Sequence, residues 1–465
     1  MLDDSIQSQM QPNTAGTSGR GRRALVFALI LAAAVRIGLL VWASNSTAIV
    51  TYDGRTREYV AEAQHLVAGD GFVKDTPSGL RPASLRPPGM ALLLAAAMSV
   101  AGSSAERVVQ LFGVLVGLLT VWLAWWLARR LLDVRAAEVV AYCVALFLPL
   151  AYYEVVPRQP DGIIACFVTA GLACMVRACD GKLPGMLRWV LVAGVVLGLG
   201  SLLRSSYMLL PLFLVAPMAW YAGRRGAATA VAVQVLVLTV MMPWALRNRL
   251  VLGEWVFTST EVGGTLVTGL GESQNAWGFG YTDGARGREA ARQGIADPFG
   301  PEGNRYFREV FWRSIRERPG AYIGTVLKRL PMLIATPFTW GYRNPHKTST
   351  FTEAREVGGR DRYEVIRSNP MYVVRAYWDS LMFAAFSLAA FAAAIMTLVL
   401  TGHRRNAALL LFSPHLYGLG VHALVHFEPR FVLASIPCWL GGLAYVIVAA
   451  RRSPKRGATT ATQEG

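Results

Sequence analysis

Long blocks of apolar residues recur along the whole 465-residue chain, and they restrict the folds that it can adopt. A helix needs about 20 predominantly apolar residues to cross a bilayer. Only 16% of the residues are charged, whereas a soluble domain carries about a quarter. The pattern predicts an all-α polytopic membrane protein with about 10–12 transmembrane helices. The ten clearest blocks are residues 24–43, 108–128, 139–156, 163–176, 189–203, 207–221, 228–246, 377–400, 407–425 and 431–450.

The basic residues between these blocks predict the orientation of the chain. Segments 88–101 and 321–340 are also apolar, but if both crossed the bilayer, Arg129, Arg130 and Arg135 would face outside, against the positive-inside rule. If neither crosses, the basic pairs beside the spans all fall in the cytoplasm. We therefore expect a multi-pass protein of the plasma (inner) membrane with cytoplasmic N- and C-termini. The two doubtful segments would lie on the outer surface as interfacial helices.

This orientation gives a simple division of the chain. Residues 1–23 form a polar, disordered cytoplasmic tail, and residues 451–465 form a basic cytoplasmic tail. The transmembrane domain covers residues 24–450, with large outer loops at 45–105 and 247–375. The net charge of +17 is explained by basic residues beside the spans and in the outer loops. We therefore expect membrane lipids and an anionic ligand as partners, and no nucleic acid.

The first outer loop concentrates acidic and basic residues, as expected of a loop that carries chemistry. Asp53 is followed by Arg55, Arg57 and Glu58. Cations near a carboxylate favour its ionised form, so Asp53 is a candidate base, although a capping aspartate fits the same position. Asp161, in RQPDG, falls on the same predicted face. It is either a turn residue or a second carboxylate that helps to place an acceptor.

Three arginines are predicted near the outer surface. Arg86 precedes two prolines that stiffen the backbone, Arg204 lies in LLRSSY, and Arg247 follows Trp244 in PWALRN. Together with Arg55 of the first loop they would suit a lipid phosphate or pyrophosphate, while membrane anchoring is the alternative for Arg86. Arg36 lies inside the first span, where an arginine is either functional or reaches back to the membrane surface.

Metal binding has one candidate pattern. His422 and His426 are four residues apart, with Glu428 just beyond, which is a spacing that can hold a divalent metal. Without a confirmed third ligand, we expect that a divalent metal could bind here but is not essential, and we assign no cofactor. No phosphate-binding glycine loop follows a predicted strand either.

The order of several motifs resembles the GT-C membrane glycosyltransferases. The resemblance is to the bacterial branch related to protein mannosyltransferases (PMT_2-like, family 39) and to the aminoarabinose transferase of lipid A. It rests on Asp53, Tyr59 and the GDGF run in the first loop, followed by RPPGMALLLA, PDG and LLRSSY. It continues with PWALRNRLVLGEWVFTSTEVGGTLVTG and ends with EPRFVLASIP, which contains Arg430.

The resemblance implies a fold and a reaction. It implies a GT-C fold and a hexosyl- or pentosyl-type transferase that takes a sugar from a polyprenyl-phosphate donor. The acceptor would be a hydroxyl of a glycan, lipid or protein on the outer side. Asp53 would be the general base of an inverting transfer, with Glu58 as a second candidate because Asp53 precedes Tyr59 by more residues than is usual in the family. Asp161 would help to place the acceptor, and Arg86 and Arg247 would hold the donor phosphate.

Two other functions share part of this pattern. A transporter or flippase of lipid-linked sugars would have paired halves with helices broken near the membrane midplane. A glycan polymerase would share the lipid-phosphate arginines without needing the aspartate of the first loop. The sequence shows no internal repeat, and its polar residues cluster at the outer face, which favours the transferase.

Overall fold

The computed structural model describes residues 18–45, 54–76, 79–155, 159–181, 183–272, 275–280, 282–335, 388 and 403–451. These residues are helical apart from connecting segments and one antiparallel hairpin, in which Val73 pairs with Pro82 and Thr76 with Gly79. The elements before residue 185 are α2 (Ser18–Asn45), α3 (Gly54–Ala68), β1 (Val73–Thr76), β2 (Gly79–Pro82), α4 (Gly89–Ala101), η1 (Gly102–Ser104), α5 (Ala105–Leu131), α6 (Val134–Leu146), α7 (Leu148–Val155) and α8 (Pro160–Asp180). The later elements are α9 (Gly185–Leu203), η2 (Ser205–Tyr207), α10 (Leu210–Phe213), α11 (Val215–Leu252), α12 (Glu261–Gly271), α13 (Asp283–Arg292), α14 (Pro301–Glu317), α15 (Pro319–Ala335), α19 (His403–Leu424), η3 (Pro429–Ser435) and α20 (Ile436–Arg451).

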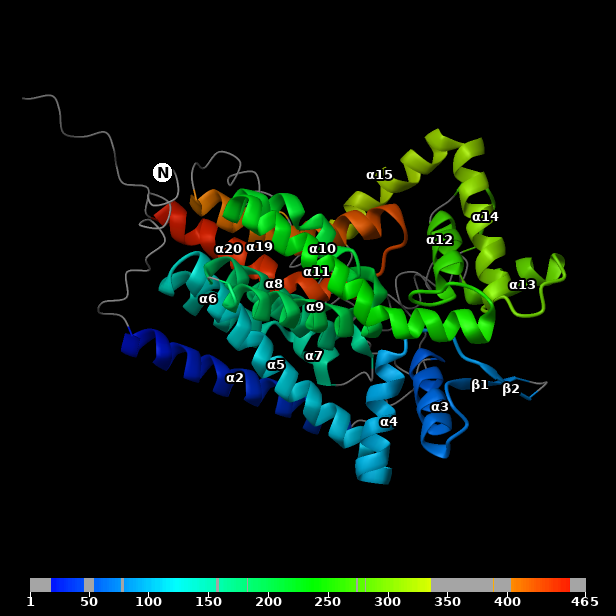
Figure 1. Ribbon diagram of the computed structural model, residues 1–465, viewed down its shortest axis with the longest axis horizontal. Coiled ribbons are helices and arrows are strands. Elements are labelled where there is room, and N and C mark those ends of the chain that lie inside the picture. Colours follow the sequence, from blue (N-terminus) through cyan, green and yellow to red (C-terminus); the bar gives the residue numbers. More distant parts are fainter. Residues whose placement is uncertain are drawn as a thin grey trace, which may run out of the picture.

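Most long helices form one bundle, with α8 near its centre in contact with α5, α7, α9, α11 and η3 (Figure 1). Small residues allow close approach between these helices. A Cβ atom at Gly194 or Gly198 of α9 would overlap Leu236 or Val240 of α11. The bundle is therefore held together by tight packing of helix faces.

Six described helices are long and apolar enough to span a membrane, and a seventh span results if α6 and α7 are counted as one bent segment. They agree with predicted spans at 24–43, 108–128, 163–176, 189–203, 228–246 and 407–425. The predicted span at 377–400 lies outside the described residues. Helix α4 has 13 residues and would extend about 20 Å, so it is too short to cross a bilayer alone.

Three predicted spans are not single helices. The block at 431–450 consists of the 3-10 helix η3 and of α20, and it is not among the six spans. The block at 139–156 bends by 55° between α6 and α7, next to Pro149, which cannot donate a backbone hydrogen bond. The block at 207–221 consists of η2, α10 and the first turns of α11. The turn that we expected after Tyr221 is a break inside α11, where Gly223 has a φ of 61°.

A glutamine side chain compensates for the break between η2 and α11. The Gln234 amide donates to the carbonyl of Met208 at 3.2 Å and accepts from the backbone N–H of Leu212 at 3.1 Å. Gln234 lies on the next predicted span, one helix further along the chain. In a membrane, backbone groups freed by a helix break need such partners because lipid offers none.

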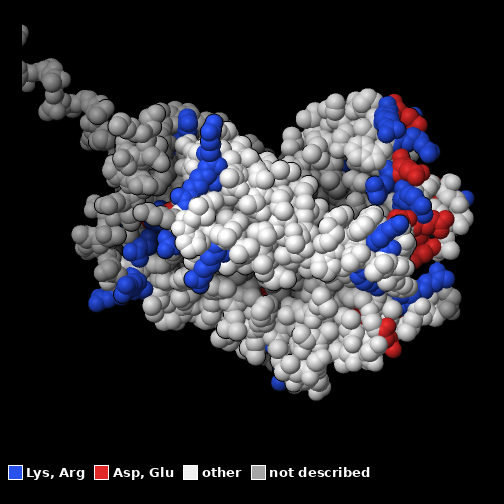
Figure 2. Space-filling model, viewed as in Figure 1, with Lys and Arg blue, Asp and Glu red and all other residues white. Residues whose placement is uncertain are grey.

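One end of the bundle carries most of the non-spanning structure, and we call it the loop end. Figure 1 shows α3, the β1–β2 hairpin and α12 to α14 gathered there. Helices α12, α13 and α14 share a small core that includes Leu270, Phe307 and Phe311. On the visible face, Lys and Arg mix with Asp and Glu at the loop end, whereas the opposite end is almost purely basic (Figure 2).

Candidate functional site

Asp161 lies in the first turn of α8, with Pro160 at the helix start, and not in a turn between helices as the sequence suggested. Its side chain is 2% exposed and accepts a hydrogen bond from Nη1 of Arg204, the residue that directly follows α9. Nε of Arg430 lies 3.9 Å from the same carboxylate oxygen. Two predicted site residues and Arg430, from α8, α9 and η3, therefore meet at the loop end.

Phe431 and Gln159 fix the two arginines around Asp161. The guanidinium carbon of Arg204 lies 4.0 Å from the centre of the Phe431 ring, and that of Arg430 lies 5.6 Å from it. Nη1 of Arg430 donates to Oε1 of Gln159 at 2.6 Å. Guanidinium groups stacked on a ring and bonded at their edges are preorganised for planar anions.

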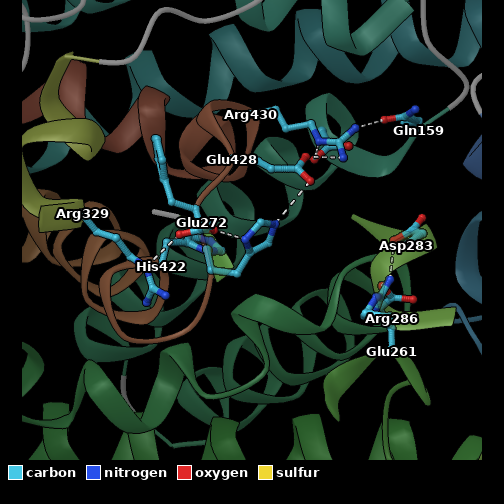
Figure 3. A network of polar contacts seen from close by, with 12 residues as sticks. Gln159, Glu261, Glu272, Asp283, Arg286, Arg329, His422, Glu428 and Arg430 are labelled. Atoms are coloured by element: carbon cyan, nitrogen blue, oxygen red, sulfur yellow. Dashed lines mark hydrogen bonds and ion pairs between the residues drawn. The ribbon is translucent and has the colours of Figure 1, made fainter. Parts of the chain in front are cut away.

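From Arg430 a network of charged side chains continues toward α12 (Figure 3). Nη2 of Arg430 is paired with Glu428, whose other oxygen lies 3.5 Å from Nε2 of His426. Nδ1 of His426 is bonded to Glu272. Burial alone would lower the pKa of His426, but its hydrogen bonds to Glu272 and Glu428 and their charges raise that pKa to about 9. His426 is thus a cation between two carboxylates at neutral pH.

Glu272 connects α12 with α15 and the end of α19. It accepts from Nε of Arg329 at 2.8 Å and from the backbone N–H of Phe427 at 2.8 Å. Arg329 is 2% exposed and also donates to the carbonyls of Ala423 and Gly269. The network therefore links α12 to α15 and to the segment between α19 and η3, which leads to Arg430.

A second group of charges surrounds Arg86 in the first loop. Nε of Arg86 donates to Glu58 at 2.9 Å, and its Nη1 lies 3.5 Å from Glu261 at the start of α12. Glu261 in turn accepts from Arg286 at 3.0 Å, and Arg286 also bonds Asp283 at 2.5 Å (Figure 3). Glu58, a candidate base, is therefore already engaged with a candidate phosphate-binding arginine.

Arg247 links the first loop to α11, inside the last turns of that helix. It donates to the carbonyls of Ala83 at 2.8 Å and Phe72 at 2.6 Å, and to the side chain of Asn248 at 2.9 Å. Its guanidinium carbon lies 5.1 Å from the ring centre of Trp244. Arg247 thus holds the loop in place by bonds to its backbone.

Close contact between α4 and α9 brings the two groups of charges toward each other. A Cβ atom at Gly89 would overlap the backbone of Leu202 and Leu203, so only glycine permits this approach. Arg86 precedes this contact by three residues, and Arg204 follows it directly. The two arginines thus flank the junction of α4 and α9.

Arg36 is neither at the loop end nor directed to the membrane surface. Its side chain is fully buried and pairs with Glu154 of α7, with Nη2 and Nε 2.6 and 2.7 Å from the same carboxylate oxygen. A Cβ atom at Gly117 of α5 would overlap both side chains. The pair therefore holds α2 and α7 against α5. The alternative that Arg36 reaches back to the membrane surface is wrong.

The remaining predicted residues have other surroundings. Tyr59 is 5% exposed and packs in the main apolar core with Ala63 and Met90. Asp53 lies outside the described residues, and Arg55 is described only as part of α3. His422 contacts the carbonyl of His426, at 3.1 Å from its Nδ1.

Metal ligands do not gather in the described parts of the chain, where no three His, Cys, Asp or Glu side chains are arranged to hold an ion. The suggested group of His422, His426 and Glu428 is instead part of the hydrogen-bonded network.

Several charged residues of the site were not predicted. Glu272, Arg329, Glu261 and Arg286 lie in the long segment after α11 and pair with residues up to 175 positions away. Glu272 follows a glycine-rich apolar stretch, which is the one local signal that it ends a buried helix. Their partners could not be chosen from sequence spacing.

Comparison with known proteins gives one family match. Residues 85–246 match the model of the dolichyl-phosphate-mannose-protein mannosyltransferases. No curated protein matches the chain in sequence.

Solved structures show the fold. The archaeal oligosaccharyltransferase AglB from Archaeoglobus fulgidus, in complex with an inhibitory peptide and a dolichol-phosphate, aligns with 94% of this chain at 14% identity and a TM-score of 0.53. The chain has the GT-C fold. The apo form of the same transferase aligns with 93% of the chain at 15% identity and a TM-score of 0.51. The GT-C chain spans about half the length of these proteins, 51% in both cases.

A GT-C protein closer in length also aligns. ArnT from Cupriavidus metallidurans bound to undecaprenyl phosphate matches over 91% of this chain and 76% of its own, at 15% identity and a TM-score of 0.36. The predicted GT-C fold and the resemblance to lipid-linked-sugar transferases are thus confirmed by the family match and the AglB structures.

Proposed function

We propose that this GT-C protein transfers a sugar from a polyprenyl-phosphate donor to an acceptor hydroxyl at its loop end. The single observation that carries the proposal is the meeting of Arg204 and Arg430 around Asp161, beside the junction that leads to Arg86. Phosphate groups are held by such fixed guanidinium groups. The matched family is described as using dolichyl-phosphate mannose, and AglB was solved with a dolichol-phosphate.

The loop end would face the periplasm, with both termini in the cytoplasm. The opposite end carries Arg22 and Arg23 at the start of α2, Arg129 and Arg130 at the end of α5, and Arg224 at the break in α11. Cytoplasmic loops carry such an excess of basic residues. The mixed charge of the loop end fits the outer side of the plasma membrane.

The proposed reaction is a displacement at the anomeric carbon. The acceptor oxygen forms a bond to that carbon while the bond to the donor phosphate breaks, and Asp53 takes the proton of the hydroxyl. The leaving polyprenyl phosphate gains negative charge, which Arg86, Arg204 and Arg430 would stabilise. Asp161 would then act by aligning two arginines, and the sugar carbon would be inverted.

The test compares cells that carry the wild-type protein, a deletion, Asp53→Asn, Arg204→Gln or the control Arg177→Gln. Arg177 is 51% exposed near the basic end. Mass spectrometry of lipid extracts should show one polyprenyl-phosphate sugar accumulating in all strains except wild type and Arg177→Gln. If no such lipid accumulates in the deletion strain, the proposed donor is wrong. Accumulation in the deletion but not in Asp53→Asn removes Asp53 as the base.

A transporter of lipid-linked sugars is the second candidate, because two predicted spans are broken, at Phe147 and before α11. Detergent-solubilised protein distinguishes the two functions, since transport needs two separated compartments. Transfer of the sugar to an acceptor in detergent supports the transferase. A protein that moves labelled donor across vesicles but transfers nothing in detergent is a transporter.

A further inference from the structure

Glu62 is a buried carboxyl group in the first loop that has no role in the reaction proposed above. It is 4% exposed and lies on α3, a helix that packs against α4 and β1. Its Oε2 atom has no hydrogen-bond partner. Glu58, one helical turn earlier, is by contrast 38% exposed and bonded to Arg86. Buried carboxyl groups are normally paired, so Glu62 calls for an explanation.

Charged groups surround Glu62 from its own helix, from β1, from the segment before α4 and from α11. They are Glu58 on α3, Lys74 on β1, Arg86 before α4 and Arg247 on α11. Each cation is engaged elsewhere: Lys74 pairs with Asp297 at 2.9 Å, Arg86 bonds Glu58, and Arg247 donates to the loop backbone. Glu62 therefore lies among cations that it does not bind.

Burial and the nearby Glu58 charge raise the pKa of Glu62 to about 8, although the three cations oppose this shift. The carboxyl group is consequently neutral at pH 7. Arg86 already pairs with Glu58 and Glu261, and Arg247 donates to backbone carbonyls and Asn248. A neutral Glu62 adds no further negative charge beside them, which leaves more of their positive potential to another anion. An ionised Glu62 would add a negative charge beside both arginines and compete with that anion.

We propose that Glu62 is a positioning residue that must stay protonated for Arg86 and Arg247 to hold the phosphate of a polyprenyl-phosphate lipid. This inference rests on the proposed function, which assigns the lipid phosphate to Arg86, and it adds Arg247 to the arginines near that phosphate. Protonation and lipid binding are then linked: the lipid binds the protonated protein, and binding draws a proton onto Glu62 when the pH exceeds its pKa.

The experiment measures binding of undecaprenyl phosphate to the purified full chain in nanodiscs between pH 7 and pH 9. Linkage to one group with a pKa of about 8 predicts an affinity loss of about tenfold over this interval. Glu62→Gln is uncharged at every pH and should bind with nearly constant affinity. Glu302→Gln makes the same change at an exposed position of α14 and should behave as wild type.

A measurement on the wild-type protein does not depend on the folding of a variant. Calorimetry at pH 9 in two buffers of different ionisation enthalpy should show uptake of about one proton per bound lipid. Equal pH dependence in wild type and Glu62→Gln, or no proton uptake, overturns the role of Glu62 while the proposed function stands. Absence of lipid binding by the wild type at every pH overturns the proposed donor and this inference with it.

Discussion

Removing one partner of the buried Arg36–Glu154 pair should be among the most destabilising single changes in the bundle. Both side chains are fully buried, and Arg36 also donates to the carbonyls of Ala32 and Ala145. Arg36→Met keeps the approximate volume but leaves the Glu154 carboxylate unpaired. Breaking a buried pair in this way costs about 3–5 kcal/mol. The pair packs directly against Gly117, since a Cβ atom at that position would overlap both side chains.

The double variant Arg36→Met/Glu154→Met shows whether Arg36→Met loses stability because a charge partner is missing or because packing is lost. Two apolar side chains in place of a buried pair are often neutral, so the double variant should lie within about 1 kcal/mol of wild type. Arg177→Met removes an exposed arginine that lies 3.6 Å from Asp180 and should change stability by less than about 1 kcal/mol. The free energy of unfolding is measured in mixed micelles with SDS, by tryptophan fluorescence. A stable Arg36→Met protein, or a double variant as unstable as the sum of the single ones, refutes the reasoning.

Two further predictions concern polar contacts at the helix ends. Because the pKa of His426 is raised above its usual value to about 9, its charge stabilises the fold fully below pH 6.5 and loses this effect as the pH rises through 9. The unfolding temperature should therefore fall between pH 7 and pH 10, and Glu272→Gln should make that fall smaller. The control Tyr322→Phe removes only a neutral hydrogen bond to the carbonyl of Leu424 and should leave the fall unchanged. Gln234→Leu should cost about 1–3 kcal/mol because it leaves two backbone groups unpaired. Unfolding in mixed micelles measures this cost. A loss of stability below about 0.5 kcal/mol would show that the backbone groups at the helix break find other hydrogen-bond partners.

The spanning helices were predictable because apolar length and basic flanks are local properties of the sequence. The breaks in the helices were harder to predict. A block such as 207–221 is apolar enough to span a membrane, and the positions of its prolines alone do not decide where the helix ends. The position of Asp161 shows the same limit: PDG is typical of a turn, yet Pro160 equally starts a helix.

Candidate site residues were predictable where a motif marked them, and their partners were not. Arg86, Arg204 and Asp161 stand out in the sequence, but nothing local links Asp161 to Arg430, 269 residues later, or Arg36 to Glu154, 118 residues later. Glu62 carries no sequence signal at all, because one acidic residue on an amphipathic helix is ordinarily exposed. Long-range packing alone determines that this carboxyl group is buried.

The bonds made by Gln234 bear on how the chain enters the bilayer during synthesis. The backbone of Met208 and Leu212 depends on a side chain 22 to 26 residues further along, which emerges from the ribosome later. Until that side chain arrives, segment 205–221 would leave polar groups bare in lipid, at a cost of several kcal/mol for each group. The segment should therefore wait at the translocon and partition into the membrane together with the helix that follows it, as a paired unit.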